Sequence, residues 1–264
     1  MNLKEIEKKV WDRYWKNAKS SKSMSSRLGG VIDFFGTRTN IKDIQQTDLD
    51  DLIDHCLSIG NTPATINRKL SVFSKMQQFA YDRGYTDKLL KLEYQKEAPG
   101  RIRFLSKVEE QAMLAFSPVA IRDFLVVMID TGLRPSEIRG LRELDVEDRW
   151  VLVSDTKNGT TRRIPLTNRA NSILANHVRF ECLCSITPAL LNYTWNVCKQ
   201  TLKIDDPEFV PYACRHTFAS RLIQKGVEIT TIMKLMGHKN IQMTMRYAHL
   251  APANLQEAIN LLEE

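Results

Sequence analysis

The sequence changes character once, at residues 93–104 (EYQKEAPGRIRF). Before this segment, apolar residues recur at helical spacing and no run alternates as a strand would. After it, helical stretches are mixed with two short alternating runs. Pro99 and Gly100 break regular structure, and the basic residues around them are typical of an interdomain linker. We therefore expect two domains, covering residues 1–92 and 105–264.

The first domain is predicted to be all helical. Thr62 can cap a helix that Pro63 opens and Gly84 ends, with apolar residues at helical spacing between them. A polar loop is expected at 19–26. The other helices of this domain are expected at 3–17, 27–35 and 47–59, the last capped by Thr47.

The second domain is predicted to be helices plus one small antiparallel sheet. Strands are expected at 146–154 and 162–166, around the hairpin turn Lys157-Asn158-Gly159. Gly132 and Pro135 separate two of the helices. The helices of this domain are expected at 107–116, 118–131 and 135–141, and from 167 onward with breaks at 182–187, 204–211, 226 and 237. The fold class is therefore α+β and mostly α.

Composition excludes few classes of protein. With 43% hydrophobic and 26% charged residues, the chain is an ordinary folded globular protein. No run approaches the roughly 20 apolar residues of a membrane span, and the N-terminus does not have the pattern of a signal peptide. We therefore expect a cytoplasmic protein that has no membrane partner. The formal charge of +7 permits nucleic-acid binding without establishing it.

The five cysteines are odd in number and scattered, which favours a reducing compartment over a disulfide framework. Cys182 and Cys184 lie near His177 and Cys198, which raises the alternative of a metal site. Their C-x-C spacing is shorter than usual zinc-ligand spacing, and no second pair matches it. We expect small buried thiols and neither a metal nor a cofactor.

Several polar residues of the second domain look ordinary when each is taken alone. Arg134 could pair with Glu137, and Arg215 with His216 could be a buried polar pair. His238 could end a helix, and Tyr247 could be a half-buried aromatic residue. Their order along the chain is more informative. The set comprises GLRPSEI at 132–138, Lys157 in a turn, RHTFAS at 215–220, LMGH at 235–238 and Tyr247.

This set resembles the tyrosine recombinase (phage integrase) family. TGLRPSEIRGLRELD at 131–145 and DTKNGTTRRIPL at 155–166 look like the opening segments of the family's catalytic domain. Residues 62–84 look like the last helices of its SAM-like core-binding domain. The resemblance covers nearly the whole chain. It implies a DNA-binding domain at 1–92, a linker at 93–104, and a catalytic domain with a tail helix at 105–264.

The resemblance also implies residue roles. Arg134 and Arg215 would stabilise the charge on a phosphodiester in the transition state, without a metal. Tyr247 would be the nucleophile that forms a 3′-phosphotyrosyl link. Lys157 would protonate the leaving 5′-oxygen, although a turn lysine could instead only touch the DNA backbone. His238 would hydrogen-bond the scissile phosphate.

One residue departs from the family pattern. The family shows His-x-x-Arg before the second arginine, whereas here Tyr212 precedes Arg215 by three positions. A tyrosine hydroxyl can donate a hydrogen bond to phosphate but is a poor base near neutral pH. The proton role could pass to water or to His216, which otherwise reads as mainly structural.

The implied activity is site-specific DNA recombination by a homotetramer on duplex DNA that carries a specific site, with an accessory DNA-bending or directionality protein as a further partner. Integration or excision of a phage or mobile element is favoured, in a prokaryotic cell or a phage-infected host. The alternatives are Xer-like resolution of replicon dimers, transposon mobilisation, a type IB topoisomerase, and a catalytically weak DNA-binding protein on the same fold. The amphipathic tail at 254–262 would pack on its own domain or dock on a neighbouring protomer.

Overall fold

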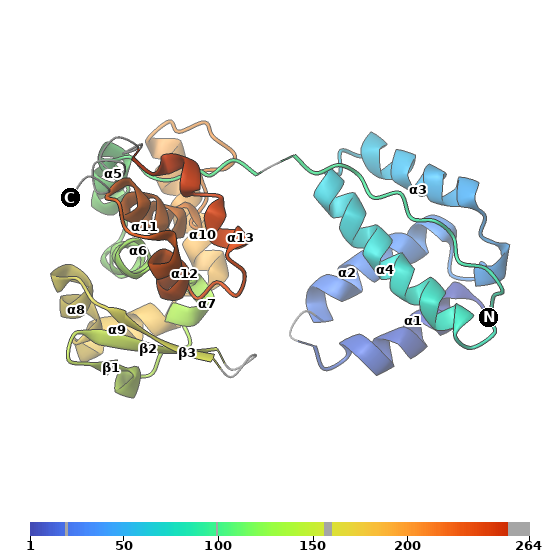
Figure 1. Cartoon of the computed structure of the whole chain (residues 1–264), viewed down its shortest axis with the longest axis horizontal. Coiled ribbons are helices and arrows are strands. Elements are labelled where there is room, and N and C mark those ends of the chain that lie inside the picture. The colour runs from blue at the N-terminus through green and yellow to red at the C-terminus, as the bar shows by residue number, and fades with distance from the viewer. Residues whose placement is uncertain (19–20, 99, 156–159, 253–264) are drawn as a thin grey trace, which may run out of the picture. The chain divides into compact units, whose positions relative to one another are not determined.

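The computed structural model describes residues 1–18, 21–98, 100–155 and 160–252 (Figure 1). The chain forms two compact units, Met1–Pro99 and Gly100–Glu264, here called the N-terminal and C-terminal units. The boundary falls within the segment that the sequence predicted as a linker. The turn Lys157-Asn158-Gly159 and the tail at 254–262 lie outside the described residues.

The N-terminal unit is helical (Figure 1). Its apolar residues form one core, in which Leu3, Leu28 and Phe73 have no exposed surface. The helix α4 contacts both α1 and α2, so it is the element around which the unit packs. The elements are α1 (Leu3–Val10), a π-helical turn (Trp11–Trp15), α2 (Ser21–Phe35), a 3-10 turn (Ile41–Asp43), α3 (Gln46–Ser58) and α4 (Pro63–Tyr81).

Two helix starts differ from the sequence prediction. The helix α2 begins at Ser21, so most of the predicted polar loop at 19–26 is helical. Its serines and lysine contain no helix breaker, and Met24 packs against the core. The helix α3 begins at Gln46 rather than after Thr47, because the Asp48 carboxylate accepts a hydrogen bond from the backbone N–H of Gln45 at 2.7 Å. The predicted start of α4 is confirmed, since Thr62 Oγ1 accepts from the backbone N–H of Thr65.

The segment after α4 is extended and is held by side-chain amides. Asn67 exchanges two hydrogen bonds with the backbone of Gln95, at 2.7 and 2.8 Å. Gln46 does the same with the backbone of Lys91, at 3.0 and 3.1 Å. Each amide therefore satisfies one backbone N–H and one C=O, as a neighbouring strand would.

The C-terminal unit combines nine α-helices and two 3-10 turns (Glu143–Asp145 and Ala248–Leu250) with a three-stranded antiparallel sheet in the order β1-β2-β3, counting the described residues. The sequence predicted one strand over 146–154, and this was wrong. Asp148 and Arg149 have φ values of 43° and 65°, which turn the chain back and divide that stretch into two strands. The strands are β1 (Val146–Glu147), β2 (Trp150–Asp155) and β3 (Thr160–Pro165). The helices are α5 (Lys107–Phe116), α6 (Val119–Thr131), α7 (Pro135–Ile138), α8 (Asn168–Leu174), α9 (His177–Ser185), α10 (Pro188–Thr201), α11 (Ala213–Gln224), α12 (Ile229–Met236) and α13 (Gln242–Met245).

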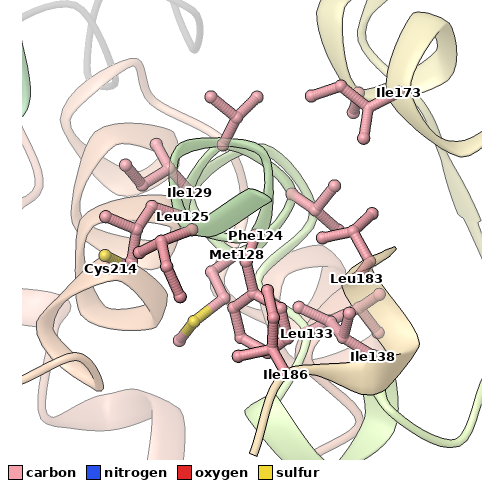
Figure 2. Packing of buried hydrophobic residues seen from close by; sticks show 14 of the residues in the cluster. Phe124, Leu125, Met128, Ile129, Leu133, Ile138, Ile173, Leu183, Ile186 and Cys214 are labelled. Atoms are coloured by element: carbon pink, nitrogen blue, oxygen red, sulfur yellow. The ribbon is translucent and has the colours of Figure 1, made fainter. Parts of the chain in front are cut away.

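The helix α6 lies at the centre of this unit and is apolar on nearly every face. Figure 2 shows Phe124 beside Leu133 and Ile186, while Leu125 and Ile129 lie on the side of Cys214 of α11. A helix that is buried all round has a fixed position. Its C-terminal end therefore holds the loop that follows it in a defined place against α11.

The cysteine prediction is confirmed for three residues and wrong for one. Cys56, Cys198 and Cys214 are buried thiols, whereas Cys182 is exposed on α9 because the inward positions of that helix are taken by Phe180 and Leu183.

Candidate active site

The carboxylate of Glu137 contacts both arginines that the sequence predicted for the site, and a third arginine besides. Glu137 on α7 accepts hydrogen bonds at 2.8 Å from the backbone N–H and from Nη1 of Arg134. Arg162 on β3 makes a two-pronged contact with the same carboxylate, at 2.9 and 3.2 Å. Arg215 approaches it to 3.9 Å. Three guanidinium groups from three elements therefore surround one carboxylate.

The charge of Glu137 is preserved despite its burial. Burial acts to raise the pKa of this carboxyl, but the hydrogen bonds from Arg162 and from the backbone of Arg134 outweigh it and hold the pKa below its usual range. The side chain is therefore an anion at neutral pH. It can hold Arg134 and Arg215 near each other, which their mutual repulsion would otherwise oppose.

Arg215 is the most buried of these cations, with no exposed surface. Its Nη1 donates to the carbonyl of Gly132 and its Nη2 to the carbonyl of Met236, the latter at 2.6 Å. Burial lowers the pKa of Arg215 to about 10, so the guanidinium remains charged at neutral pH. Within the described residues its Nε has no hydrogen-bond partner, which leaves one donor for a ligand.

Two glycines allow these close approaches. Gly132 ends α6 with φ +67°, and a Cβ there would lie 2.4 Å from the ring of Phe218. Gly237 ends α12 with φ +63°, and a Cβ there would lie 2.7 Å from Nη1 of Arg162. Both positions therefore require glycine for conformation and for space.

His238 follows Gly237 directly and is 8% exposed. Its Nδ1 shares a hydrogen bond of 2.8 Å with Oγ1 of Thr244. Burial, and then the charges of Arg215 and Arg134, lower the pKa of His238 to about 4. The ring is therefore neutral at pH 7, and its bond to Thr244 fixes its orientation.

Basic residues line a cavity of about 470 Å³ beside this cluster. Among its walls are Arg134 and His238, so two of the sequence-predicted residues face one hollow. The other basic residues that line it are Arg162, Arg163, Lys234 and Lys239. A hollow with this lining suits a phosphate group.

Tyr247 lies just beyond α13 and is 1% exposed. Its hydroxyl is 2.6 Å from Nδ1 of His216 on α11. Burial raises the pKa of Tyr247 to about 12, although the charges of Arg246 and Arg215 act in the opposite direction. Burial, followed by the same two arginines, lowers the pKa of His216 to about 4. The pair is therefore a neutral phenol bonded to a neutral imidazole.

Tyr212 stands one turn before His216, at the start of α11. Its side chain is 39% exposed, and its ring meets the ring of His216 edge-on, with centroids 5.3 Å apart and planes at 74°. It also lines a small hollow together with Pro135 and Pro188. Tyr212 therefore packs beside His216, the hydrogen-bond partner of Tyr247.

The structure thus gathers Arg134, Arg215, His238 and Tyr247, while Lys157 lies outside the described residues. The roles assigned to these residues stay predictions. Sequence reasoning missed Arg162 and Thr244, and treated Glu137 only as a partner for Arg134. The alternation of residues 162–166 signalled that Arg162 lies on a strand, but which group it meets depends on the tertiary fold.

Comparison with known proteins gives the family. The sequence profile of the phage integrase family matches residues 103–254, more than half of the chain. The integrase of Escherichia phage P2 is 25% identical over 268 residues, covering 98% of this chain and 77% of that protein. Tyrosine recombinase XerA of Saccharolobus solfataricus is 29% identical over 146 residues, covering 51% of this chain. The chain spans about half the length of that archaeal relative (48%). This protein belongs to the phage integrase family, as its sequence predicted.

Solved structures confirm the predicted fold class. The integrase of transposon Tn1549, in complex with a circular intermediate DNA, has a TM-score of 0.79 at 19% identity, covering 100% of this chain and 99% of that one. A lambda integrase dimer bound to a COC′ core site has a TM-score of 0.77 at 15% identity, covering 93% and 76%. In the described part of this chain, no helix combines the length and apolarity that crossing a membrane requires.

Proposed function

We propose that this protein is a site-specific tyrosine recombinase that cuts and rejoins DNA through a 3′-phosphotyrosyl intermediate. The observation that carries the proposal is that Arg134 and Arg215 meet at Glu137, that Arg134 and His238 line one basic hollow, and that the charge of Arg215 acts on Tyr247. Membership of the phage integrase family supports the same conclusion.

The chemistry suits these side chains. The hydroxyl oxygen of Tyr247 attacks a DNA phosphorus, the bond from phosphorus to the 5′-oxygen breaks, and the phenol proton is lost to a base. The two arginines stabilise negative charge on the non-bridging oxygens, and His238 donates a hydrogen bond to one of them. Lys157 is assigned the proton donor for the leaving oxygen on the family resemblance alone. The phosphotyrosyl bond conserves the energy for rejoining, so neither ATP nor a cofactor is needed.

Covalent trapping tests this proposal. The protein is incubated with nicked duplex fragments tiled across the genomic neighbourhood of its own gene, then denatured and searched by mass spectrometry for a DNA-linked peptide. We expect an adduct on Tyr247 that is absent from Tyr247→Phe. Tyr193→Phe is the matched control, because that tyrosine is 69% exposed on α10, and it should form the adduct normally.

Two results would count against the proposal. Tight binding without any adduct between pH 6 and 9 would identify a DNA-binding protein on a recombinase fold. An adduct that survives in Tyr247→Phe would place the nucleophile elsewhere. Binding itself should weaken steeply with added salt, because phosphate contacts release counterions.

The similarities to known recombinases also suggest a DNA partner, an oligomeric state and a biological role for this protein. We infer a homotetramer on duplex DNA that carries a specific site, working in the cytoplasm of a prokaryotic cell or a phage-infected host. Integration or excision of a mobile element is the favoured role, since the similarity to phage P2 integrase covers 98% of the chain, whereas that to XerC of Neisseria meningitidis covers 79%. Sequencing the DNA attached to Tyr247 tests this role: an element boundary supports integration, and a replicon-dimer site supports resolution.

A further inference from the structure

The helix α11 carries two consecutive residues that reach different parts of the site. Arg215 faces the carbonyls of Gly132 and Met236, near Glu137. His216, the next residue, places its Nδ1 2.6 Å from the hydroxyl of Tyr247. The position from which the family's histidine would assist the nucleophile is held by Tyr212, and the imidazole beside Tyr247 comes instead from one turn further along the helix.

We propose that His216, and not Tyr212, accepts the proton of Tyr247 during strand cleavage. The proposal rests on the recombinase function proposed above. It stands on the direct contact between Nδ1 and the hydroxyl, which is within the reach that a general base requires. Tyr212 is unsuited to the role, because a phenol already carries its proton at neutral pH and cannot take another.

The proton transfer has a defined direction. This transfer requires the tautomer of His216 that carries the ring hydrogen on Nε2, in which Nδ1 accepts the hydrogen bond from Tyr247. As the bond between the tyrosine oxygen and phosphorus forms, the O–H bond breaks and Nδ1 gains the proton, which makes the ring an imidazolium. In the rejoining step the imidazolium returns this proton to the departing tyrosine oxygen.

The charges around His216 determine when transfer occurs. The charges of Arg246, beyond α13, and of Arg215 on α11 both act on the ring, which also contacts Tyr247 and Tyr212. With a pKa of about 4 for His216 and about 12 for Tyr247, the proton stays on the phenol until attack begins. A bound phosphodiester brings negative charge that offsets the two arginines and raises the basicity of His216.

Tyr212 then has a different role. Its edge-on contact with the His216 ring, together with the hydrogen bond to Tyr247, constrains the plane of the imidazole. We therefore treat Tyr212 as a positioning residue. The expectation from sequence that His216 is mainly structural is replaced here by a chemical role.

The test is single-turnover cleavage of a nicked duplex substrate by the full chain carrying His216→Asn. The Asn oxygen can still accept the hydrogen bond from Tyr247 but has no useful basicity. If His216 only holds the tyrosine, this variant should cleave within threefold of the unsubstituted protein. If His216 is the base, cleavage and rejoining should both slow by about 100-fold or more, with DNA binding unchanged.

Two further measurements separate this role from others. A substrate with a 5′-bridging sulfur, whose leaving group needs no proton, should not restore the rate of His216→Asn, whereas it would rescue a lost proton donor. Adding Tyr212→His to His216→Asn should recover at least tenfold, because an imidazole then returns to the family position.

The pH profiles of the unsubstituted protein and of His216→Asn provide a further comparison. The cleavage rate of the unsubstituted protein should fall as pH decreases through the pKa of His216, since an imidazolium cannot accept a proton. This limb should be absent from His216→Asn. A rate for His216→Asn within threefold of normal, a rescue by bridging sulfur, or an unchanged acid limb would overturn the assignment. Absence of any Tyr247 adduct in the unsubstituted protein would overturn the recombinase proposal and this one together.

Discussion

The two units bury different kinds of side chain. Among the described residues of the N-terminal unit, only Gln77 and Thr86 are both polar and buried, and neither carries charge. The C-terminal unit buries the charged residues Glu110, Asp123 and Arg215. The first unit is therefore stabilised chiefly by loss of apolar surface, at about 25 cal/mol per Å². The second adds ionic contacts that fix where segments meet.

Two of the three buried carboxylates of the C-terminal unit join elements that are distant in sequence, whereas the third, Asp145, pairs with Arg142 three residues away. Glu110 on α5 bonds Arg169 on α8 at 2.8 Å and also Arg221 on α11. Asp123 on α6 bonds Arg179 on α9 at 2.7 Å through both oxygens. In the unit with the candidate site, part of the interior is therefore occupied by ion pairs that fix the relative positions of its helices. Its stability should consequently depend on pH and on single charges.

Acid should reveal the largest difference between the units. The pKa values of His216 and His238 are lowered to about 4, and hydrogen bonds from arginines hold those of Glu110 and Glu137 below the usual range despite burial. The unfolded chain therefore binds more protons than the folded chain as pH falls from about 6.5, and folding weakens. Hydrogen exchange, corrected for intrinsic rates, should show the C-terminal unit losing protection at higher pH than the N-terminal unit. Earlier opening of the N-terminal unit would contradict the comparison.

Removal of one buried carboxylate should have the next largest effect. Glu110→Ala removes the carboxylate partner of Arg221 and one of the two carboxylates that Arg169 bonds, and should lower the free energy of unfolding of the C-terminal unit by about 3 kcal/mol. Urea titration followed by hydrogen exchange of peptides from each unit measures this loss. The control is Glu7→Ala, which breaks an exposed pair with Lys4 in the N-terminal unit and should cost at most about 1 kcal/mol. Equal losses would show that burial of the pair is irrelevant.

Two glycines, one in each unit, differ in how much space surrounds them. Gly60 and Gly132 have φ values of +77° and +67°, but a Cβ meets nothing within 4 Å at Gly60 and meets Phe218 at 2.4 Å at Gly132. Gly60→Ala should cost about 1–2 kcal/mol, for backbone conformation alone. Gly132→Ala should cost about 1–3 kcal/mol more, because the ring of Phe218 must move. Denaturant unfolding of both variants gives the difference, and equal values would refute the crowding argument.

The smallest effect is expected from Arg162→Lys, on the rate of DNA cleavage. A lysine cannot span both oxygens of Glu137, so Arg162→Lys should loosen the carboxylate that holds Arg134 and Arg215. Single-turnover cleavage should slow about tenfold, equivalent to about 1.4 kcal/mol, with DNA binding changed by less than threefold. The control is Arg142→Lys, whose side chain is 63% exposed and bonds both oxygens of Asp145. If both variants cleave normally, Arg162 has no positioning role.

The helices were largely predictable because their signals are local. Thr62 with Pro63 marked the start of α4, and Gly132 marked the end of α6. The predictions failed where a non-local or weak signal decided the structure. The turn at Asp148 and Arg149 contains no glycine, so nothing in the sequence indicated the positive φ values that separate β1 from β2.

The candidate site was predictable as a set of residues but not as a set of contacts. The family resemblance supplied Arg134, Arg215, His238 and Tyr247. It did not supply the hydrogen bond between His216 and Tyr247, because which side chain of α11 meets the segment after α13 depends on packing rather than spacing. Arg162 was missed for the same reason, since its partner Glu137 lies 25 residues away.

The burial of Tyr247 and Arg215, at 1% and 0% exposure, has a kinetic consequence. If Tyr247 and Arg215 act on a phosphodiester as proposed, the site has to open first, and the observed cleavage rate would be the intrinsic rate multiplied by the population of the open conformation. Each 1.4 kcal/mol needed to open the site divides the observed rate by ten. A DNA site that stabilises the open form raises the rate without altering any reacting group. Selectivity for DNA sequence can thus be expressed in the rate of cleavage as well as in the strength of binding.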